Sequence, residues 1–317
     1  MSLNNQSVAI TDYFRQEKNN RYFEIKYERR KLKREYIYER GTESYDDVIT
    51  IQIGDGVHYG IGECSPFPSF FEWPIEKVLN DLKSCTEHIL AGISFDSLDT
   101  ELSSPARSGI DLAFIDLKCQ QTKKSIIDLY GLPLPKEVTI SHTVEYESLS
   151  KLGHQLRDVS NLPFLKVKLG SDGLDEERLA LVCQRAPNAS IVVDVNEGWT
   201  LSHLKKIMPV LLKYRVKMIE QPLRHGEDDG LEDYNSPIPI YADESFKSLD
   251  DLTVLASRYD GFNIKLDKIG GFNQAFRAVN LCQKMGKQIM VDCKSCISRC
   301  WWVVHDSYQP DFNSQQR

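Results

Sequence analysis

Four short runs decide the fold of this chain: FLKVKL at 164–169, IVVDVN at 191–196, MIEQP at 218–222 and IYADES at 240–245. Each run is largely apolar and has the length of a strand rather than of a helix. Longer segments with helical periodicity lie between the runs, which is typical of a parallel sheet covered by helices. A charged residue lies at or near the point where each strand should end.

The same alternation extends through the second half of the chain. Strands are expected at 139–144, 164–169, 191–195, 218–220, 240–242, 262–266 and 288–291. Helical segments are expected at 174–185, 201–214, 249–257 and 273–285. No glycine-rich dinucleotide fingerprint or P-loop follows the first strand, which disfavours a nucleotide-binding sheet. Periodicity leaves both an open sheet and a closed barrel possible.

The first 135 residues predict a different architecture, with antiparallel strands followed by helices. Strands are expected at 22–27, 48–53 and 59–63, and helical segments at 74–93 and 105–130. Gly54-Asp55-Gly56 has the composition of a hairpin turn. The Gly-Leu-Pro-Leu-Pro stretch at 131–135 breaks the chain. We therefore expect an α+β domain over 1–135 and a β/α domain over 136–317.

Composition excludes several classes of protein. The 317 residues are 41% hydrophobic and 27% charged, an ordinary globular mixture. The formal net charge of −7 argues against a nucleic-acid partner, and the basic run 29–34 is interpreted as a solvated segment. No apolar run is long enough to span a membrane, and residues 1–20 lack a signal-peptide core. Dispersed cysteines without a secretion signal predict reduced thiols and a cytoplasmic location.

A cysteine cluster near the C-terminus suggests a second kind of site. Cys293, Cys296 and Cys300 have a metal-like spacing, and His305 could supply a fourth zinc ligand. Because no second C-x-x-C pair is present, a chance cluster is the favoured interpretation. A zinc-binding module remains an alternative hypothesis for this segment.

Three acidic residues fall at the predicted strand ends. Asp194, Glu220 and Asp243 are separated by 26 and 23 residues, close to the length of one β/α repeat. They should therefore lie side by side on neighbouring strands. Three converging carboxylates repel one another unless a cation neutralises them. A set of oxygen ligands without His or Cys favours Mg²⁺ over Zn²⁺.

Lysines lie on both sides of this acidic row. Lys166 and Lys168 share one strand face, because side chains alternate with a period of two. Lys265 lies 22 residues beyond Asp243, one repeat further around the rim. The positive charge of a neighbouring ammonium and of Mg²⁺ disfavours protonation of Lys168, which suits a general base.

An ordered set of motifs resembles the enolase superfamily, in particular its muconate-lactonizing subgroup. The set comprises Lys166-x-Lys168, Asp194-x-Asn196, Glu220-Gln221-Pro222, Asp243-Glu244-Ser245, Asn263-Ile264-Lys265 and, upstream, Gly60-x-Gly62-Glu63-x-x-Pro66. The resemblance implies an α+β capping domain on a modified (β/α) TIM-type barrel. It also implies one Mg²⁺ per subunit, held by the three acids, and abstraction of a proton next to a carboxylate to give an enolate.

Two further expectations concern residues that support the chemistry. Glu244 is expected in the outer shell of the metal, and Lys166 is expected to influence the charge on Lys168. Asn196, in the motif that contains Asp194, is a third supporting residue.

Within the subgroup, the run Asn263–Gly271 is most similar to dipeptide epimerases such as L-Ala-D/L-Glu epimerase. That resemblance implies an isomerase in which Lys168 and Lys265 act as bases on opposite faces of the α-carbon. The alternative is an o-succinylbenzoate synthase, in which Lys168 is the base and Lys265 stabilises the enolate. Muconate cycloisomerases and N-acylamino acid racemases share the same residues. The expected partners are a small carboxylate or dipeptide substrate and a second copy of the chain.

The C-terminal segment departs from the family pattern. The seventh strand continues as Asp292-Cys293-Lys294, and no Asp-x-Asp motif, which would hold the substrate ammonium on an eighth strand, follows it. We therefore expect a barrel without its last β/α unit and an atypical, truncated or frame-shifted tail from about 291 to 317. An inactive remnant of the superfamily that still binds Mg²⁺ is the hypothesis from another functional class.

Overall fold

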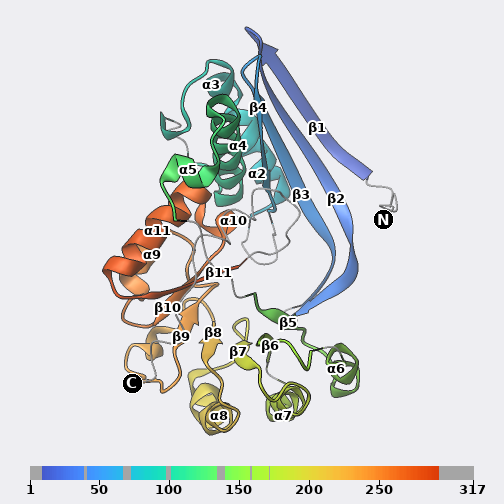
Figure 1. Ribbon diagram of the computed structural model, residues 1–317, viewed down its shortest axis with the longest axis vertical. Coiled ribbons are helices and arrows are strands. Elements are labelled where there is room, and N and C mark those ends of the chain that lie inside the picture. The colour runs from blue at the N-terminus through green and yellow to red at the C-terminus, as the bar shows by residue number, and fades with distance from the viewer. Residues whose placement is uncertain are drawn as a thin grey trace.

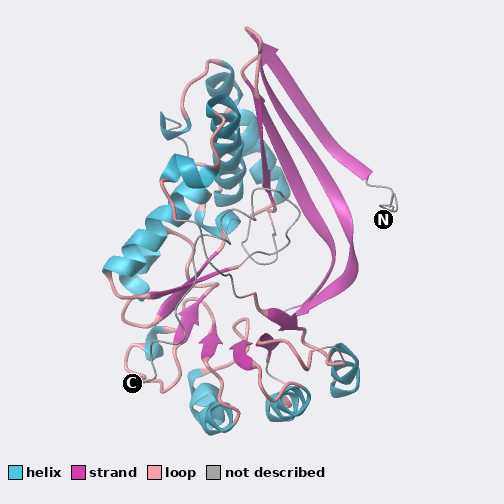
Figure 2. Ribbon diagram, in the orientation of Figure 1, coloured by secondary structure: helices cyan, strands magenta, loops and turns pink. Residues whose placement is uncertain are grey.

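Two sheets form the framework of the molecule (Figures 1 and 2). The computed structural model describes residues 9–38, 41–66, 73–97, 101–133, 140–157, 159–170 and 172–292. In the first sheet, four antiparallel strands follow one another in chain order: β1 (Ala9–Lys18), β2 (Arg21–Tyr38), β3 (Gly41–Gly54) and β4 (Tyr59–Cys64). The predicted hairpin joins β3 to β4.

Helices cover one face of this sheet. They are α2 (Ile75–Ser84), α3 (Thr86–Leu90), the 3-10 turn η1 (Phe95–Ser97), α4 (Ser104–Thr122) and α5 (Ile126–Tyr130). The two expected helical segments are each interrupted, at Cys85 and at Lys123. Lys123 has a positive φ of 54°, which ends α4, and a Ser125 capping box begins α5.

Two glycines allow α4 to press directly onto β4. A Cβ atom at Gly60 would lie 2.1 Å from the Ala113 carbonyl oxygen, and one at Gly62 would lie 1.9 Å from that of Gly109. Any larger residue would therefore force the helix away from the sheet. The Gly60-x-Gly62 part of the motif at residues 60–66 therefore serves to let the helix pack closely on the sheet.

The second sheet is parallel and curves as a half-barrel. Its strands are β5 (His142–Val144), β6 (Phe164–Lys168), β7 (Ser190–Asp194), β8 (Met218–Glu220), β9 (Ile240–Ala242), β10 (Gly261–Ile264) and β11 (Gln288–Val291). The order runs from β11 to β5, and no pairing among the described strands closes the ring. A strand is present in each of the seven expected segments, although the first is shorter than expected, since β5 begins at His142.

Helices connect these strands, as the alternation predicted. They are α6 (Leu149–Gln155), α7 (Asp175–Arg185), α8 (Leu201–Lys213), the 3-10 turn η2 (Asp229–Leu231), α9 (Leu249–Leu255), α10 (Leu266–Ile269) and α11 (Phe272–Lys284). The expected strand at 262–266 was wrong at its end. β10 stops at Ile264, and Lys265 is the N-cap of the short helix α10, which ends at Gly270 in the left-handed conformation.

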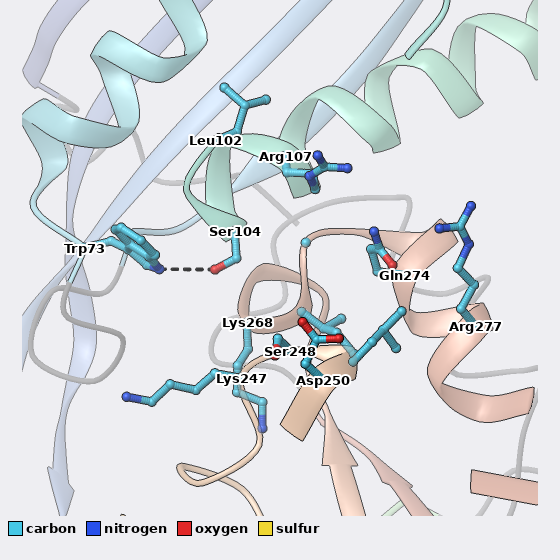
Figure 3. A pocket seen from close by; sticks show the side chains of 13 residues that line it. Trp73, Leu102, Ser104, Arg107, Lys247, Ser248, Asp250, Lys268, Gln274 and Arg277 are labelled. Carbon is cyan, nitrogen blue, oxygen red and sulfur yellow. Dashed lines mark hydrogen bonds between the residues drawn. The ribbon is translucent and has the colours of Figure 1, made fainter. Parts of the chain in front are cut away.

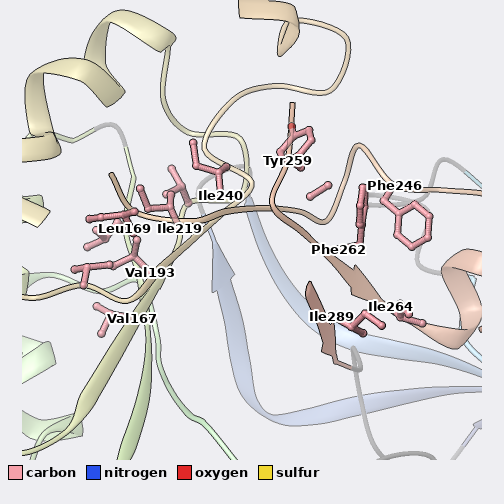
Figure 4. Packing of buried hydrophobic residues seen from close by; sticks show 14 of the residues in the cluster. Val167, Leu169, Val193, Ile219, Ile240, Phe246, Tyr259, Phe262, Ile264 and Ile289 are labelled. Carbon is pink, nitrogen blue, oxygen red and sulfur yellow. The ribbon is translucent and has the colours of Figure 1, made fainter. Parts of the chain in front are cut away.

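Alternate residues of the parallel strands point to opposite faces. One set packs with the covering helices in a large apolar core; it includes Val167, Val193, Ile219, Ile240 and Phe262 (Figure 4). The other set forms a smaller cluster of Val192, Met218 and Tyr241, with Phe164 and Met290 packed against it. The polar residues at the strand ends continue this second face.

Helix α4 joins the two halves of the molecule. Its Ile110 and Ala113 pack with the antiparallel sheet, whereas its Leu112 and Ile115 belong to the core of the parallel sheet. Asp111 accepts hydrogen bonds from Asn273 Nδ2 at 2.5 Å and from Asn273 N at 3.0 Å. This helix therefore fixes the N-terminal half against the parallel sheet.

Several expectations concern residues outside the described ranges. These are the domain boundary near residue 135, the proposed zinc ligands Cys293, Cys296, Cys300 and His305, and the eighth strand with the atypical tail. Within the described ranges, every helix is too short or too polar to cross a lipid bilayer.

Candidate active site

Strand register brings the predicted acids together. Lys168 pairs with Asp194 across β6 and β7, and Asp194 pairs with Glu220 across β7 and β8. Glu220 pairs with Tyr241, so Asp243 follows two residues later on the same face. All three carboxylates are almost completely buried. The row that sequence spacing predicted is thus present at one edge of the sheet.

Ammonium groups lie against each end of this row and in its middle. Lys168 Nζ is 2.8 Å from Asp194 Oδ2, and Lys265 Nζ is 2.6 Å from Asp243 Oδ2. Lys166 Nζ lies 2.9 Å from Asp194 Oδ2 and 2.8 Å from Glu220 Oε2. Lys168 and Lys265 therefore contact the first and the last acid of the row, and Lys166 lies between them.

Asn196 and Glu244 connect the two ends. Asn196 Oδ1 accepts a 2.6 Å hydrogen bond from Lys168 Nζ, while its Nδ2 donates to Glu244 Oε1 at 3.1 Å. The backbone N–H of Asn196 donates to Asp194 Oδ1 at 3.1 Å. Its φ of 44° lies in the left-handed region, which Asn tolerates better than most residues. This turn aims the amide at Lys168.

Burial and charge separate the pKa values of the acids. Burial raises the pKa values of Asp194 and Asp243, but the neighbouring lysine ammonium groups outweigh it and hold both below their usual range. Burial and the charge of Asp194 raise the pKa of Glu220 to about 7. Burial and the charge of Asp243 raise the pKa of Glu244 to about 8. The site therefore holds more negative charge than its lysines fully compensate.

The chemistry of the donor set fits a hard divalent cation. The three acids offer only oxygen donors. Glu220 Oε2 accepts no hydrogen bond within the part of the chain that the structure describes, although Lys166 Nζ lies 2.8 Å away as an ion-pair partner. As the side chains stand, no three His, Cys, Asp or Glu residues in the described ranges converge closely enough to hold a metal ion. Lysine ammonium groups lie between the acids, so metal binding requires Lys166 to move aside.

Two further acids at strand ends were not selected from the sequence. Asp292 directly follows β11, and its Oδ2 lies 3.0 Å from Lys166 Nζ and 4.0 Å from Lys265 Nζ. Glu145 directly follows β5, beside Lys168. The rule that identified Asp243, a polar residue just after an apolar strand, would have found both.

Two buried residues support Asp243 through contacts that sequence reasoning missed. Lys268 Nζ donates to Asp243 Oδ1 and to the Asp243 carbonyl, both at 2.7 Å. Gln221 Oε1 accepts from the backbone N–H of Asp243 at 2.8 Å and from that of Ser245 at 3.1 Å. These bonds fix the turn after β9, which carries Asp243.

A cavity of about 670 Å³ lies beside the acids, between α4 and the helices α9, α10 and α11 (Figure 3). Arg107, Lys247 and Arg277 give its lining a positive charge. Lys268 lines the cavity and also contacts Asp243, whereas Lys168, Lys265 and the three acids of the row do not line it. The cavity therefore adjoins the acid and lysine row without containing it.

Sequence comparison finds relatives across most of the chain. Residues 151–305 match a family model described as Enolase C-terminal domain-like. The chain is 31% identical over 267 residues to an L-Ala-D/L-Glu epimerase of Escherichia coli strain K12, covering 83% of each chain. It is also 31% identical over 249 residues to an N-acetyl-D-glutamate racemase of a Pseudoalteromonas species, covering 78% of each.

Structure comparison agrees. An enolase family member from Agrobacterium tumefaciens, described as homologous to dipeptide epimerases, matches with a TM-score of 0.81 and 34% identity. The match covers 86% of this chain and 84% of that one, and that structure holds sodium and L-Ala-L-Glu. The range matched by the family model contains every acid and lysine of the row.

Proposed function

This chain belongs to the enolase superfamily, and on that premise we propose that it is an isomerase that epimerises a dipeptide. The reaction moves a proton at a carbon next to a carboxylate. The observation that carries the proposal is the placement of Lys168 and Lys265 at opposite ends of one acidic row. Two lysine side chains in these positions can reach the two opposite faces of one α-carbon.

Each lysine has a role in the proposed reaction. In its neutral form, one lysine accepts the α-proton, and the other, as an ammonium, returns a proton to the opposite face with inverted configuration. The roles exchange for the reverse reaction. Asn196, through its 2.6 Å hydrogen bond, keeps Lys168 Nζ in place for this transfer.

The three acids of the row, Asp194, Glu220 and Asp243, would hold one Mg²⁺ per subunit. When bound, that ion would supply positive charge to the substrate carboxylate and so make the α-proton more acidic. Glu244 would lie in its outer shell through Asn196. The buried walls of the site exclude water, which strengthens these electrostatic interactions.

Three related reactions use the same residues. The N-acetyl-D-glutamate racemase has the same 31% identity to this chain as the dipeptide epimerase, over 249 rather than 267 residues, which favours racemisation of an N-acylated amino acid as a second candidate. An o-succinylbenzoate synthase would need Lys168 as base and Lys265 only as a stabilising charge. A muconate cycloisomerase would use the same set of residues. These alternatives differ in whether Lys265 transfers a proton.

We place the activity in the cytoplasm. The five cysteines within the described ranges (Cys64, Cys85, Cys119, Cys183 and Cys282) are all free thiols, as expected in a reducing compartment.

Proton NMR in D₂O with Mg²⁺ tests the proposal. The panel contains L-Ala-L-Glu, related dipeptides and an N-acyl amino acid. We expect loss of an α-proton signal together with the appearance of the matching diastereomer. If the protein is folded and binds Mg²⁺ but exchanges the α-proton of none of these compounds, epimerisation is contradicted. That result would favour the synthase or an inactive remnant.

A further inference from the structure

Glu145 occupies the rim position beside Lys168. β5 and β6 pair in parallel through Thr143 with Lys166 and Val144 with Val167. Continuing that register by one residue places Glu145 next to Lys168. Because in-register residues of parallel strands share a face, the Glu145 side chain is on the same face as Lys168 and Asp194.

The Glu145 carboxylate has an unused buried oxygen. Its Oε2 is shielded from solvent and accepts no hydrogen bond from any residue in the described ranges. Burial raises the pKa of this carboxyl group, while the charge of Lys168 opposes the rise. Leaving a buried acceptor without a partner is costly, so such an atom calls for an explanation.

Asp194, Asp243 and Asp292, three other acids of this rim, already have cationic partners. Asp194 and Asp243 each lie within 3 Å of a lysine Nζ, and Asp292 lies 3.0 Å from Lys166 Nζ. A positively charged substrate group would therefore have to displace a lysine at those acids. At Glu145 Oε2 it would displace no hydrogen-bond donor.

The backbone holds Glu145 in a fixed position. Its N–H donates to Gln155 Oε1 at 3.0 Å, so helix α6 anchors the residue from one side. Arg178 Nη2 donates to the Glu147 carbonyl at 3.2 Å, and its guanidinium carbon lies 4.3 Å from the centre of the Tyr146 ring. A carboxylate on such a braced turn is pre-organised for binding.

We infer that Glu145 binds the free N-terminal ammonium of the substrate, so that this enzyme acts on unacylated dipeptides rather than on N-acyl amino acids. The inference rests on the proposed function and narrows its substrate class. Four lysines of the site (Lys166, Lys168, Lys265 and Lys268) suit the carboxylate end of a substrate. A carboxylate without a partner suits its ammonium end. N-acylation removes that positive charge and would leave Glu145 unpaired.

The test compares two substrates that differ only in this charge, L-Ala-L-Glu and N-acetyl-L-Ala-L-Glu. Glu145→Gln keeps the shape of the side chain and removes its charge. We expect KM for L-Ala-L-Glu to rise about tenfold or more, since a charge-assisted hydrogen bond is lost. kcat should change little, and any activity on the acetylated compound should be unaffected.

Glu147→Gln is the matched control. Glu147 lies on the same turn, but its carboxylate is 3.4 Å from Lys151 Nζ. The control removes the same charge two residues away and should leave both KM values unchanged. Equal losses on both substrates in Glu145→Gln, or no loss on either, would overturn the inference.

A calorimetric titration separates this inference from the proposed function. Wild-type protein that binds L-Ala-L-Glu without exchanging its α-proton, and loses that binding in Glu145→Gln, would refute the epimerase and uphold the ammonium site. Wild-type protein that exchanges only N-acyl amino acids would uphold α-proton abstraction and overturn the ammonium site. Failure to bind the free dipeptide would also overturn it.

Discussion

Lys168 Nζ donates a 2.6 Å hydrogen bond to Asn196 Oδ1, although the two residues belong to neighbouring strand ends 28 positions apart. The bond restricts a side chain that is otherwise among the most flexible in proteins. It also places the ammonium against Asp194 at the first end of the acidic row. Asn196 is therefore expected to control where the proposed base stands.

Replacing Asn196 by Ala should lower kcat about 10–100-fold and change KM little, because substrate contacts remain while the base loses its orientation. Steady-state kinetics of the proposed epimerisation measures both constants. Asn188→Ala is the control, since Asn188 is exposed and remote from the strand-end row. An unchanged kcat in Asn196→Ala would show that Lys168 is positioned by other contacts.

Glu220→Gln should affect metal binding and stability in opposite directions. The amide can still accept the 2.7 Å hydrogen bond from Asn263 Nδ2, so the fold is retained. Mg²⁺ affinity should fall roughly tenfold or more because one charged ligand is lost. At pH 8 the metal-free variant should be more stable by on the order of 2 kcal/mol, since a buried carboxylate whose pKa is raised to about 7 is removed.

Calorimetry with Mg²⁺ and urea unfolding in EDTA measure these two effects. Glu232→Gln, at an exposed position, is the control and should change neither. Undiminished Mg²⁺ affinity in Glu220→Gln would remove Glu220 from the ligand set.

The metal-free protein should lose stability as pH rises from about 4.5 to 8. Glu220 and Glu244 have pKa values raised to about 7 and 8, so the folded state holds protons that the unfolded state has released. Stability is then fully present below the unfolded pKa and declines through this window. Asp194 and Asp243, whose pKa values are lowered, stay ionised throughout and contribute no slope.

Thermal melting between pH 5 and 8.5, with EDTA or with Mg²⁺, measures this dependence. The increase in Tm caused by Mg²⁺ should grow with pH, because the ion competes with protons for the same carboxylates. A Mg²⁺ effect of equal size at pH 5 and pH 8 would argue against carboxylate ligation.

Gly261→Ala should destabilise the parallel sheet by about 1–3 kcal/mol. A Cβ atom at 261 would lie 2.6–2.8 Å from three atoms of the Tyr241 ring, which is fully buried on the neighbouring strand. Gly153→Ala in α6 is the matched control, because no atom of the described residues outside its own helix backbone and chain neighbours lies within 4 Å of the added methyl group. The control should raise the free energy of unfolding by up to about 1 kcal/mol. Equal Tm values for the two variants would show that the ring moves freely.

The strand-end acids could be predicted because the pattern that marks each of them lies in the residues directly before it. An apolar run followed by Asp194, Glu220 or Asp243 marks both a strand and its carboxyl end, and parallel strands present those ends at one edge. Glu145 and Asp292 carry the same signal but were not selected. Their strands, β5 and β11, are the two edges of the described sheet.

Other features depend on contacts between distant residues. Gln221 Oε1 fixes the turn at Asp243 by accepting hydrogen bonds from the backbone N–H groups of Asp243 and Ser245, 22 and 24 positions away. A pattern of neighbouring residues cannot predict such contacts. Lys268 belongs to the run Asn263–Gly271, but its contact with Asp243 depends on the one-turn helix α10. The sequence pattern predicted that the preceding strand continues to residue 266 and gave no sign of this helix. In helix α4, the side of Leu112 and Ile115 meets the core of the parallel sheet, which is formed by residues later in the chain.

The most direct test of the two-base account follows α-proton exchange in D₂O separately for L-Ala-L-Glu and L-Ala-D-Glu. We predict that Lys168→Ala and Lys265→Ala both abolish epimerisation, and that each variant still exchanges the proton of one diastereomer only, with opposite preference. Such a split would place the two lysines on opposite faces of the α-carbon. If Lys265→Ala exchanged both diastereomers like the wild type, or if both variants retained the same preference, the two-base account would be contradicted.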